Sequence, residues 1–277
     1  MGFRVSTNIA AINGQRNLLG SQRMIQESFA KLSSGSRINK AADDAAGLAI
    51  SERLKGQIRS IRQANRNAND GISLVQVAEG GLNEIGNILV RMRELGVQAA
   101  SDTVGDTERG LIDKEIQQLK EESQRIASAT QWGSTKLLDG TTPVFDFQVG
   151  IFNNDLDDRI SFDSSVNVAT VDALGIDGID YTSKEGAQQA LELIDDAQNN
   201  VNGMRANLGA LQNRLTSTVN NLQISEENLA AANSRIRDTD VADATSELTK
   251  NNILLNAGVA TLAQANNINA AALKLLG

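Results

Sequence analysis

The chain has 277 residues and a formal net charge of −8, and it contains neither Cys nor His. Without these side chains the protein has no disulfides, no thiol nucleophile, few zinc ligands and no imidazole for acid–base chemistry, which disfavours an enzyme and predicts no cofactor. The negative charge disfavours nucleic acids and anionic membrane surfaces as partners.

The composition favours long helices. Only 3% of the residues are aromatic and there is a single Pro, which suits helices packed through small aliphatic side chains. No segment approaches the roughly 20 apolar residues of a membrane-spanning helix, so no membrane insertion is expected. The N-terminus lacks the apolar core of a signal peptide, so any secretion is expected to proceed without a cleaved leader.

The first predicted helix lies at the N-terminus. Its apolar residues recur every seven positions, as in a coiled coil. The row consists of Ala11, Leu18, Ile25 and Leu32, with Val5, Ile12 and Leu19 beside it. The sequence Ser-Ser-Gly-Ser at 33–36 predicts a break after this helix.

Two further helices are predicted before the middle of the chain. The first, from about 45 to 100, has a seven-residue row formed by Leu54, Ile61, Ala68, Val75, Leu82 and Leu89. Residues 101–107 form a predicted turn that contains Gly105. A shorter helix to about 129 follows, with Ile112, Leu119 and Ile126 on its apolar face.

The period of the apolar pattern changes to two between about 138 and 181, which predicts strands. The alternating residues are Phe145, Phe147, Val149 and Ile151, followed by Ile160 and Phe162. The segment 153–158, rich in Asn and Asp, separates the two runs as a turn. We expect a small β-hairpin insert here.

The longest predicted helix spans about 184 to 236, roughly 80 Å at 1.5 Å per residue. Its apolar row is Ile194, Val201, Leu208, Leu215, Leu222, Leu229 and Ile236. Thr182 and Glu185 have the spacing of a capping box at its start. Residues 238–240 then predict a break before a C-terminal helix.

The two terminal helices are predicted to pair along one apolar seam. Its residues are Leu18, Ile25, Leu32, Val241, Leu248, Leu255 and Leu262. Residues 1–44 carry a net charge of +3 and residues 238–277 carry −2, which favours pairing between the two segments. The predicted fold is therefore mainly α, a long helical coiled-coil bundle formed by the N- and C-terminal halves with a small β-hairpin insert.

Such a terminal pair buries too little apolar surface to be stable by itself. It would fold against copies of the chain and other partners, which indicates an assembly protein, or it would dock on the chain's own bundle. The periodicity leaves both alternatives open.

Several blocks of the sequence resemble bacterial flagellins. They are Leu-Ser-Ser-Gly-Ser-Arg-Ile-Asn at 32–39, Ala-Ala-Asp-Asp-Ala-Ala-Gly at 41–47, Arg-Asn-Ala-Asn-Asp-Gly-Ile-Ser at 66–73, Glu-Gly-Gly-Leu-Asn-Glu at 79–84, Leu-Gly-Ala-Leu-Gln-Asn-Arg at 208–214, Ser-Arg-Ile-Arg-Asp at 234–238 and Leu-Ala-Gln-Ala-Asn at 262–266. The resemblance covers roughly 1–140 and 185–277.

The resemblance implies a non-enzymatic subunit that self-assembles through its terminal helices into the extracellular flagellar filament for swimming motility. It implies an inner domain of 1–44 with 238–277 and an outer rod domain of 45–237. The implied partners are other flagellin subunits, the flagellar cap, junction proteins and an export chaperone, with type III export. A hook–filament junction protein shares related ends and is the alternative.

The run from Val90 to Gln98 resembles the segment read by the flagellin-sensing Toll-like receptor of animal hosts. Arg91 and Leu95 occupy matching positions, and Glu115 lies in the neighbouring helix. Gly96 departs from the more usual Ala. The alternative is that these residues only pack the rod domain or neighbouring subunits.

Two groups of acidic residues have a spacing that could suggest a metal site. Asp43 and Asp44 are adjacent, so they cannot face each other on a helix and are interpreted as solvated charges or caps. The segment 155–158 faintly resembles a calcium loop, but Ile160 and Val166 stand where such a loop needs Gly and Glu. No metal site is predicted.

Overall fold

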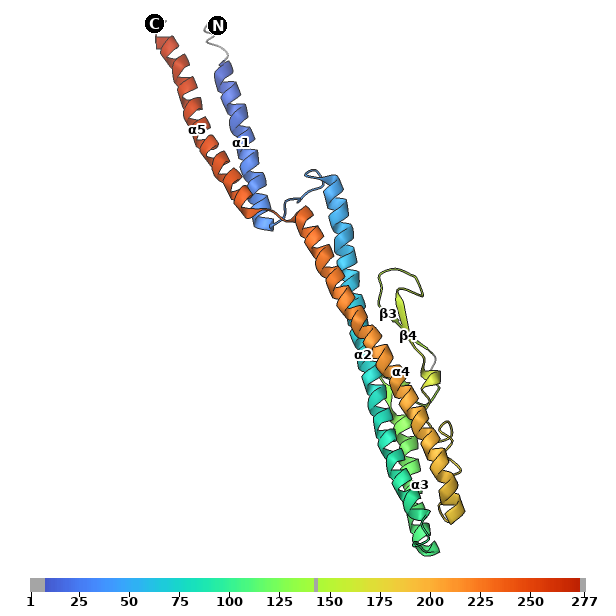
Figure 1. The fold of residues 1–277 in the computed structure, drawn as a ribbon. Coiled ribbons are helices and arrows are strands. Elements are labelled where there is room, and N and C mark those ends of the chain that lie inside the picture. The colour runs from blue at the N-terminus through green and yellow to red at the C-terminus, as the bar shows by residue number, and fades with distance from the viewer. Residues whose placement is uncertain (1–7, 142–143, 275–277) are drawn as a thin grey trace. The chain divides into compact units, whose positions relative to one another are not determined.

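The structure, a computed structural model, describes residues 8–141 and 144–274. Its helices are α1 (Ile9–Ser34), α2 (Ala45–Ala99), α3 (Asp106–Ala129), α4 (Lys184–Arg237) and α5 (Val241–Lys274). Its strands are β1 (Gln131–Trp132), β2 (Thr135–Lys136), β3 (Phe145–Gln148) and β4 (Arg159–Phe162), and a 3₁₀ turn, η1, spans Ser164–Val166. The order of the elements can be followed in Figure 1, and the predicted mainly helical fold is confirmed.

The chain divides into two compact units. The terminal unit contains residues 1–57 and 228–277, and the central unit contains residues 58–227. The first turns of α2 and the last turns of α4 thus group with the terminal helices. The functional division into 1–44 with 238–277 and 45–237 stays a prediction.

One hydrophobic core joins α2, α3, α4 and the insert within the central unit. The seven-residue row of α2 is buried from Ile61 to Leu89, and the row of α4 is buried from Ile194 to Leu215. On α3 the buried face is shifted from the predicted one. Ile116 is fully buried, whereas Leu119 and Ile126 are only partly buried against the core.

The predicted hairpin is formed by β3 and β4. They pair antiparallel, with Phe145 opposite Phe162 and Phe147 opposite Ile160. Strand β3 is shorter than the predicted run of alternating apolar residues, because it ends at Gln148. A second, two-residue hairpin, β1–β2, turns through Gly133, whose φ is +62°. Sequence reasoning did not anticipate it.

The rest of the insert, 163–183, contains no strand among the residues that the structure describes. It is nevertheless well packed, because Val171, Leu174, Ile176 and Tyr181 are buried in the core of the central unit. Residues 163–183 are therefore held in place by burial, and not by the strand pairing that the apolar pattern predicted for this part of the insert.

Tyr181 is fully buried and packs against a glycine of α2. Its hydroxyl donates to the carbonyl oxygen of Met92 at 3.4 Å. Burial, assisted by the charge of Asp113, raises the pKa of the phenol well above its usual range. A Cβ on Gly96 would lie 3.0 Å from Cε1 of Tyr181 and 3.0 Å from Cδ2 of Leu191.

We expect Gly96→Ala to destabilise the central unit, although Ala is the better helix former by about 1 kcal/mol. The added methyl group would overpack the contacts with Leu191 and with Tyr181, which is fully buried and bonded to Met92, so we expect a net cost of about 1 kcal/mol. Gly80→Ala on the same helix is the matched control, because nothing lies within 4 Å of its Cβ position. The free energy of unfolding of Gly80→Ala, measured by thermal unfolding, should rise by about 0.5–1 kcal/mol. An equal increase in the free energy of unfolding of both variants would contradict the close approach of Tyr181 to Gly96.

Candidate functional site: the paired terminal helices

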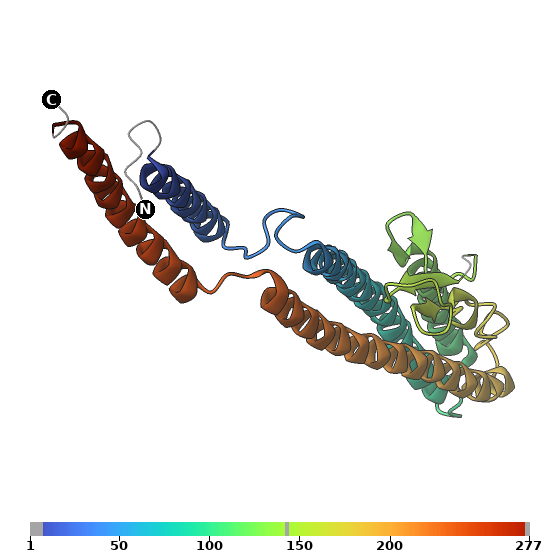
Figure 2. The same cartoon turned by 90° about the horizontal axis from the view of Figure 1, so that it is seen from above.

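Helices α1 and α5 of the terminal unit lie side by side and run antiparallel (Figures 1 and 2). Their facing positions alternate in steps of three and four residues, as in a coiled coil. On α1 these positions are Ala11, Gly14, Leu18, Ser21, Ile25, Ser28 and Leu32, and on α5 they are Ala244, Leu248, Asn251, Leu255, Gly258, Leu262 and Ala265. We call this set the seam.

Large side chains on one helix of the seam face small residues on the other. A Cβ on Gly14 would lie 3.4 Å from Cδ1 of Leu262, and a Cβ on Gly258 would lie 3.7 Å from Cγ of Leu18. Asn8 fixes one end, since its Oδ1 accepts from the amide of Ala11 and its Nδ2 donates to the carbonyl of Ala265. The side-chain cap satisfies a backbone donor that would otherwise have no partner in the helix.

The structure brings six of the seven predicted seam residues together. They are Leu18, Ile25, Leu32, Leu248, Leu255 and Leu262, and all are partly buried. Val241 is not among them, because it is 61% exposed. In the register that places Leu18 beside Gly258, Val241 lies level with Gly35, beyond the end of α1. Ala244, which is 5% exposed, is the first buried residue of α5.

The outward faces of the two helices carry a set of large apolar side chains, each between 49% and 65% exposed. These are Ile9, Ile12, Leu19, Met24 and Phe29 on α1, and Val241, Ile253, Leu254 and Val259 on α5. Exposed apolar residues that gather on one element mark an interaction surface more often than scattered ones do. The second apolar row beside the predicted seam, Ile12 and Leu19, was the sequence signal for this surface. Val5 of that row lies outside the described residues.

Two shallow hollows lie on these outward faces. The α1 groove is lined by Ile12, Gln15, Arg16, Leu19, Gly20 and Arg23. The α5 groove is lined by Ala242, Thr245, Ser246, Thr249, Lys250, Ile253 and Leu254. Both combine apolar side chains with polar or charged ones, which suits contact with another protein surface.

Hydrogen bonds between the segment that follows α1 and the segment that precedes α5 hold the end of α1 beside the start of α5 within the terminal unit. The amide of Arg37 donates to the carbonyl of Arg237 at 2.6 Å, and its guanidinium donates to the carbonyl of Ile236 at 2.8 Å. The amide of Thr239 donates to the carbonyl of Gly35 at 3.0 Å. Gly35 has a φ of +67°, which an L side chain rarely adopts.

The loop that precedes α2 is closed by an acidic side chain. Oδ2 of Asp43 accepts from the amides of Asn39 and Lys40, and the bond from Lys40 is the main cause that lowers the pKa of Asp43. Asp44 accepts from the amide of Gly47 at 2.8 Å. The interpretation of this acidic pair as caps therefore agrees with the geometry.

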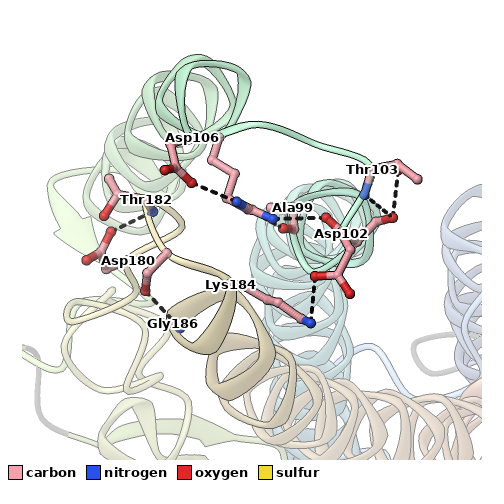
Figure 3. Close-up of polar contacts among 11 residues, drawn as sticks. Ala99, Asp102, Thr103, Asp106, Asp180, Thr182, Lys184 and Gly186 are labelled. Carbon is pink, nitrogen blue, oxygen red and sulfur yellow. Dashed lines mark hydrogen bonds and ion pairs between the residues drawn. The ribbon is translucent and has the colours of Figure 1, made fainter.

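A second polar cluster closes one end of the central unit (Figure 3). The buried guanidinium of Arg109 donates to the carbonyls of Ala99 and Ser101 and pairs with Asp106 at 2.9 Å. The bond to Ala99 satisfies a carbonyl that the last turn of α2 leaves open, and the bond to Ser101 holds the turn that follows. Because every polar atom of the guanidinium is directed at the turn, the cluster is a structural clamp.

The start of α4 lies beside this clamp. Nζ of Lys184 lies 2.7 Å from Oδ1 of Asp102, and this contact lowers the pKa of Asp102. The predicted capping box is wrong: the amide of Gly186 donates to the hydroxyl of Ser183, so Ser183 caps the helix in place of Thr182.

The predicted receptor residues are split between surface and core. Arg91 is exposed and pairs with Glu115 at 2.9 Å and with Glu94 at 3.1 Å. The bond to Glu115 is the main cause that raises the pKa of Arg91. Leu95 is only 3% exposed and belongs to the core of the central unit.

The described residues offer little for metal or membrane binding. They contain no group of three acidic side chains arranged to hold a metal ion. In the turn between β3 and β4, Asp155 pairs with Arg159 and Asp158 accepts from the amide of Asn154. None of the helices in the described ranges is long and apolar enough to cross a membrane.

Residues 5–142 match the family described as the bacterial flagellin N-terminal helical region, and residues 191–276 match the C-terminal helical region. The chain is 45% identical to a flagellin of Halalkalibacterium halodurans, covering 98% of this chain and 99% of that protein. It is 42% identical to a flagellar filament core protein of Brachyspira hyodysenteriae, with coverage of 98% and 99%.

Two solved structures have a similar fold. The crystal structure of Bacillus cereus flagellin has a TM-score of 0.51 at 29% identity and covers 61% of this chain and 94% of that one. A putative flagellar hook-associated protein of Vibrio parahaemolyticus has a TM-score of 0.59 and covers 71% of this chain and 100% of that one. At 16% identity the second likeness shows the fold alone, so it does not favour a junction protein.

Proposed function

Because this chain belongs to the bacterial flagellin family and is a structural subunit of the extracellular flagellar filament, we propose that the outward faces of α1 and α5 make its contacts with neighbouring subunits. The observation that carries this proposal is the set of large apolar side chains, 49–65% exposed, on two helices that pair through a narrow seam. Burial of each such side chain against a neighbour contributes about 1–2 kcal/mol.

The seam has a different role from the outward faces. Its residues, Leu18, Ile25, Leu32, Leu248, Leu255 and Leu262, hold α1 and α5 together, so that both outward faces are presented by one rigid pair. The assembly role predicted for these six residues is therefore indirect, through alignment of the pair. Val241, exposed at the start of α5, contributes directly to a subunit contact. Residues 1–44 with 238–277 form the inner domain of the filament, and 45–237 form the outer rod.

The same apolar faces need cover before assembly, because an exposed apolar surface promotes aggregation. An export chaperone covers them inside the cell, and the junction proteins and the flagellar cap contact them at the two ends of the growing filament. Export uses the type III route. The family is structural, and the protein has no catalytic role.

Seeded assembly tests the proposed contacts. Purified chain, monomerised by heat, is mixed with filament fragments and followed by negative-stain microscopy. We expect long uniform tubes. Paired substitutions Ile12→Ser and Leu19→Ser should prevent elongation, whereas Phe152→Ser, an exposed apolar residue of the central unit, should leave it intact. Persistent monomers of the unaltered chain would contradict self-assembly and would favour a junction-type protein.

The α2–α3 surface is a second candidate site, for the flagellin-sensing Toll-like receptor of animal hosts. The Arg91–Glu115 ion pair is exposed there, and the same two helices carry Val90, Val97 and Leu111, which are 51–61% exposed. Leu95 supports this surface from beneath and makes no direct contact with the receptor.

Signalling by receptor-bearing cells tests this second site with monomeric protein. Arg91→Ala should reduce the response at least tenfold. Arg93→Ala is the matched control, because the side chain of Arg93 is 45% exposed, against 50% for Arg91, and pairs with Asp195 of α4. Equal responses to both variants, or no response to the unaltered monomer, would reject the receptor proposal.

A further inference from the structure

The outward faces of α1 and α5 differ in charge. Arg16 and Arg23 line the α1 groove together with Ile12 and Leu19. On α5 the exposed carboxylates of Asp243 and Glu247 lie on one helix face, which continues through Lys250 to Leu254, two turns beyond Glu247. None of these four charged side chains forms an ion pair within the parts of the chain that the structure describes. Within the described parts of the chain, the only hydrogen bond of the Arg16 side chain is the one that it donates to Oδ1 of Asn13.

The two faces cannot meet within one chain. In the register of the seam, the α1 groove at 12–23 lies level with the distal half of α5, whereas the acidic face at 243–254 lies level with the end of α1. A second copy can be shifted along the axis of the α1–α5 pair so that its acidic face lies on the α1 groove of the first copy. The α5 helix of the second copy then stays antiparallel to the α1 helix of the first. Contact between unlike surfaces does not close into a dimer, so each added copy offers a free face to the next.

The charge spacing fits such a contact. With Arg16 beside Glu247 on antiparallel helices, Arg23 lies level with Asp240, which precedes α5 and accepts from the amide of Ala242. Asp243 lies one turn from Asp240 and is also within reach of Arg23. In this register Ile12 lies level with Asn251, within one turn of Ile253 and Leu254. An apolar centre flanked by opposite charges is the usual composition of a specific interface.

We propose that Arg16 and Arg23 in the α1 groove of one subunit bind the acidic face of α5, Asp243 and Glu247, in a neighbouring copy, and that this pairing sets the register of the apolar contact. The pairing rests on the proposed function, because the occupant of the groove is a second copy of this chain. Its role is mainly selection of register, since exposed ion pairs contribute little affinity by themselves.

Charge reversal tests the pairing in the seeded assembly reaction. The variants R16E/R23E and D243K/E247K should each raise the critical concentration for elongation at least tenfold on seeds of their own kind. The chain that carries all four substitutions should assemble within about threefold of the unaltered protein, because the reversed charges are complementary again. R16K/R23K, which keeps the charge, is the matched control and should assemble normally.

The outcomes separate this pairing from the proposed function. If the unaltered chain assembles and either reversed variant assembles equally well, the pairing is wrong and the assembly function stands. If the fourfold variant is as defective as the double variants, the two faces do not contact each other and the pairing is again wrong. If the unaltered chain fails on its own seeds, the assembly function is overturned together with the pairing.

Discussion

Leu255→Asp is expected to abolish filament growth while the central unit stays folded. Leu255 is partly buried in the seam between α1 and α5, in the middle of α5. An unpaired carboxylate there costs more than about 3 kcal/mol if the helices stay together. This cost separates the pair, misaligns both outward faces and raises the critical concentration more than about 100-fold. Negative-stain microscopy and sedimentation of seeded reactions measure the effect.

Leu255→Met is the matched control, since it keeps the volume and apolar character of the side chain. It should assemble with less than a threefold change in critical concentration. Removal of residues 1–30 or 250–277 is the limiting case and should also prevent growth without unfolding the central unit. Normal filaments from the Asp variant or from either truncated chain would refute assembly through the terminal pair.

Phe162→Ala is expected to have the largest effect on the central unit. Phe162 is 1% exposed, and its ring centroid lies 6.0 Å from that of Phe145 on the paired strand. Loss of a buried Phe side chain costs about 3–5 kcal/mol, because the cavity is only partly refilled. For a unit of this size the thermal midpoint should fall by roughly 10 °C, measured by circular dichroism.

Phe152→Ala provides the comparison, because Phe152 belongs to the same insert and is 68% exposed. Its thermal midpoint should change by less than about 2 °C. If both variants unfold at the same temperature as the unaltered protein, the hairpin does not contribute to the core. The Leu255→Asp variant should also keep this midpoint, which separates a defect in assembly from a defect in folding.

The sequence by itself determined the helices and their approximate ends. A seven-residue apolar repeat can be satisfied only by a helix packed along one face, so the ranges of about 45–100 and 184–236 agree closely with Ala45–Ala99 and Lys184–Arg237. The alternation around 145–162 likewise identified the hairpin, because a period of two fits only a strand. The family followed from blocks of residues near both ends of the chain.

Only the tertiary structure decided which apolar row each helix buries and which residues remain exposed. Leu95 is in the core, Ile116 of α3 is fully buried whereas Leu119 is only partly buried, and Val241 is exposed because α1 ends before it can be covered. Gly96 is required by the ring of Tyr181, which is distant in the sequence. Periodicity describes one helix at a time, whereas burial depends on where a partner helix begins, ends and approaches closely enough to exclude water.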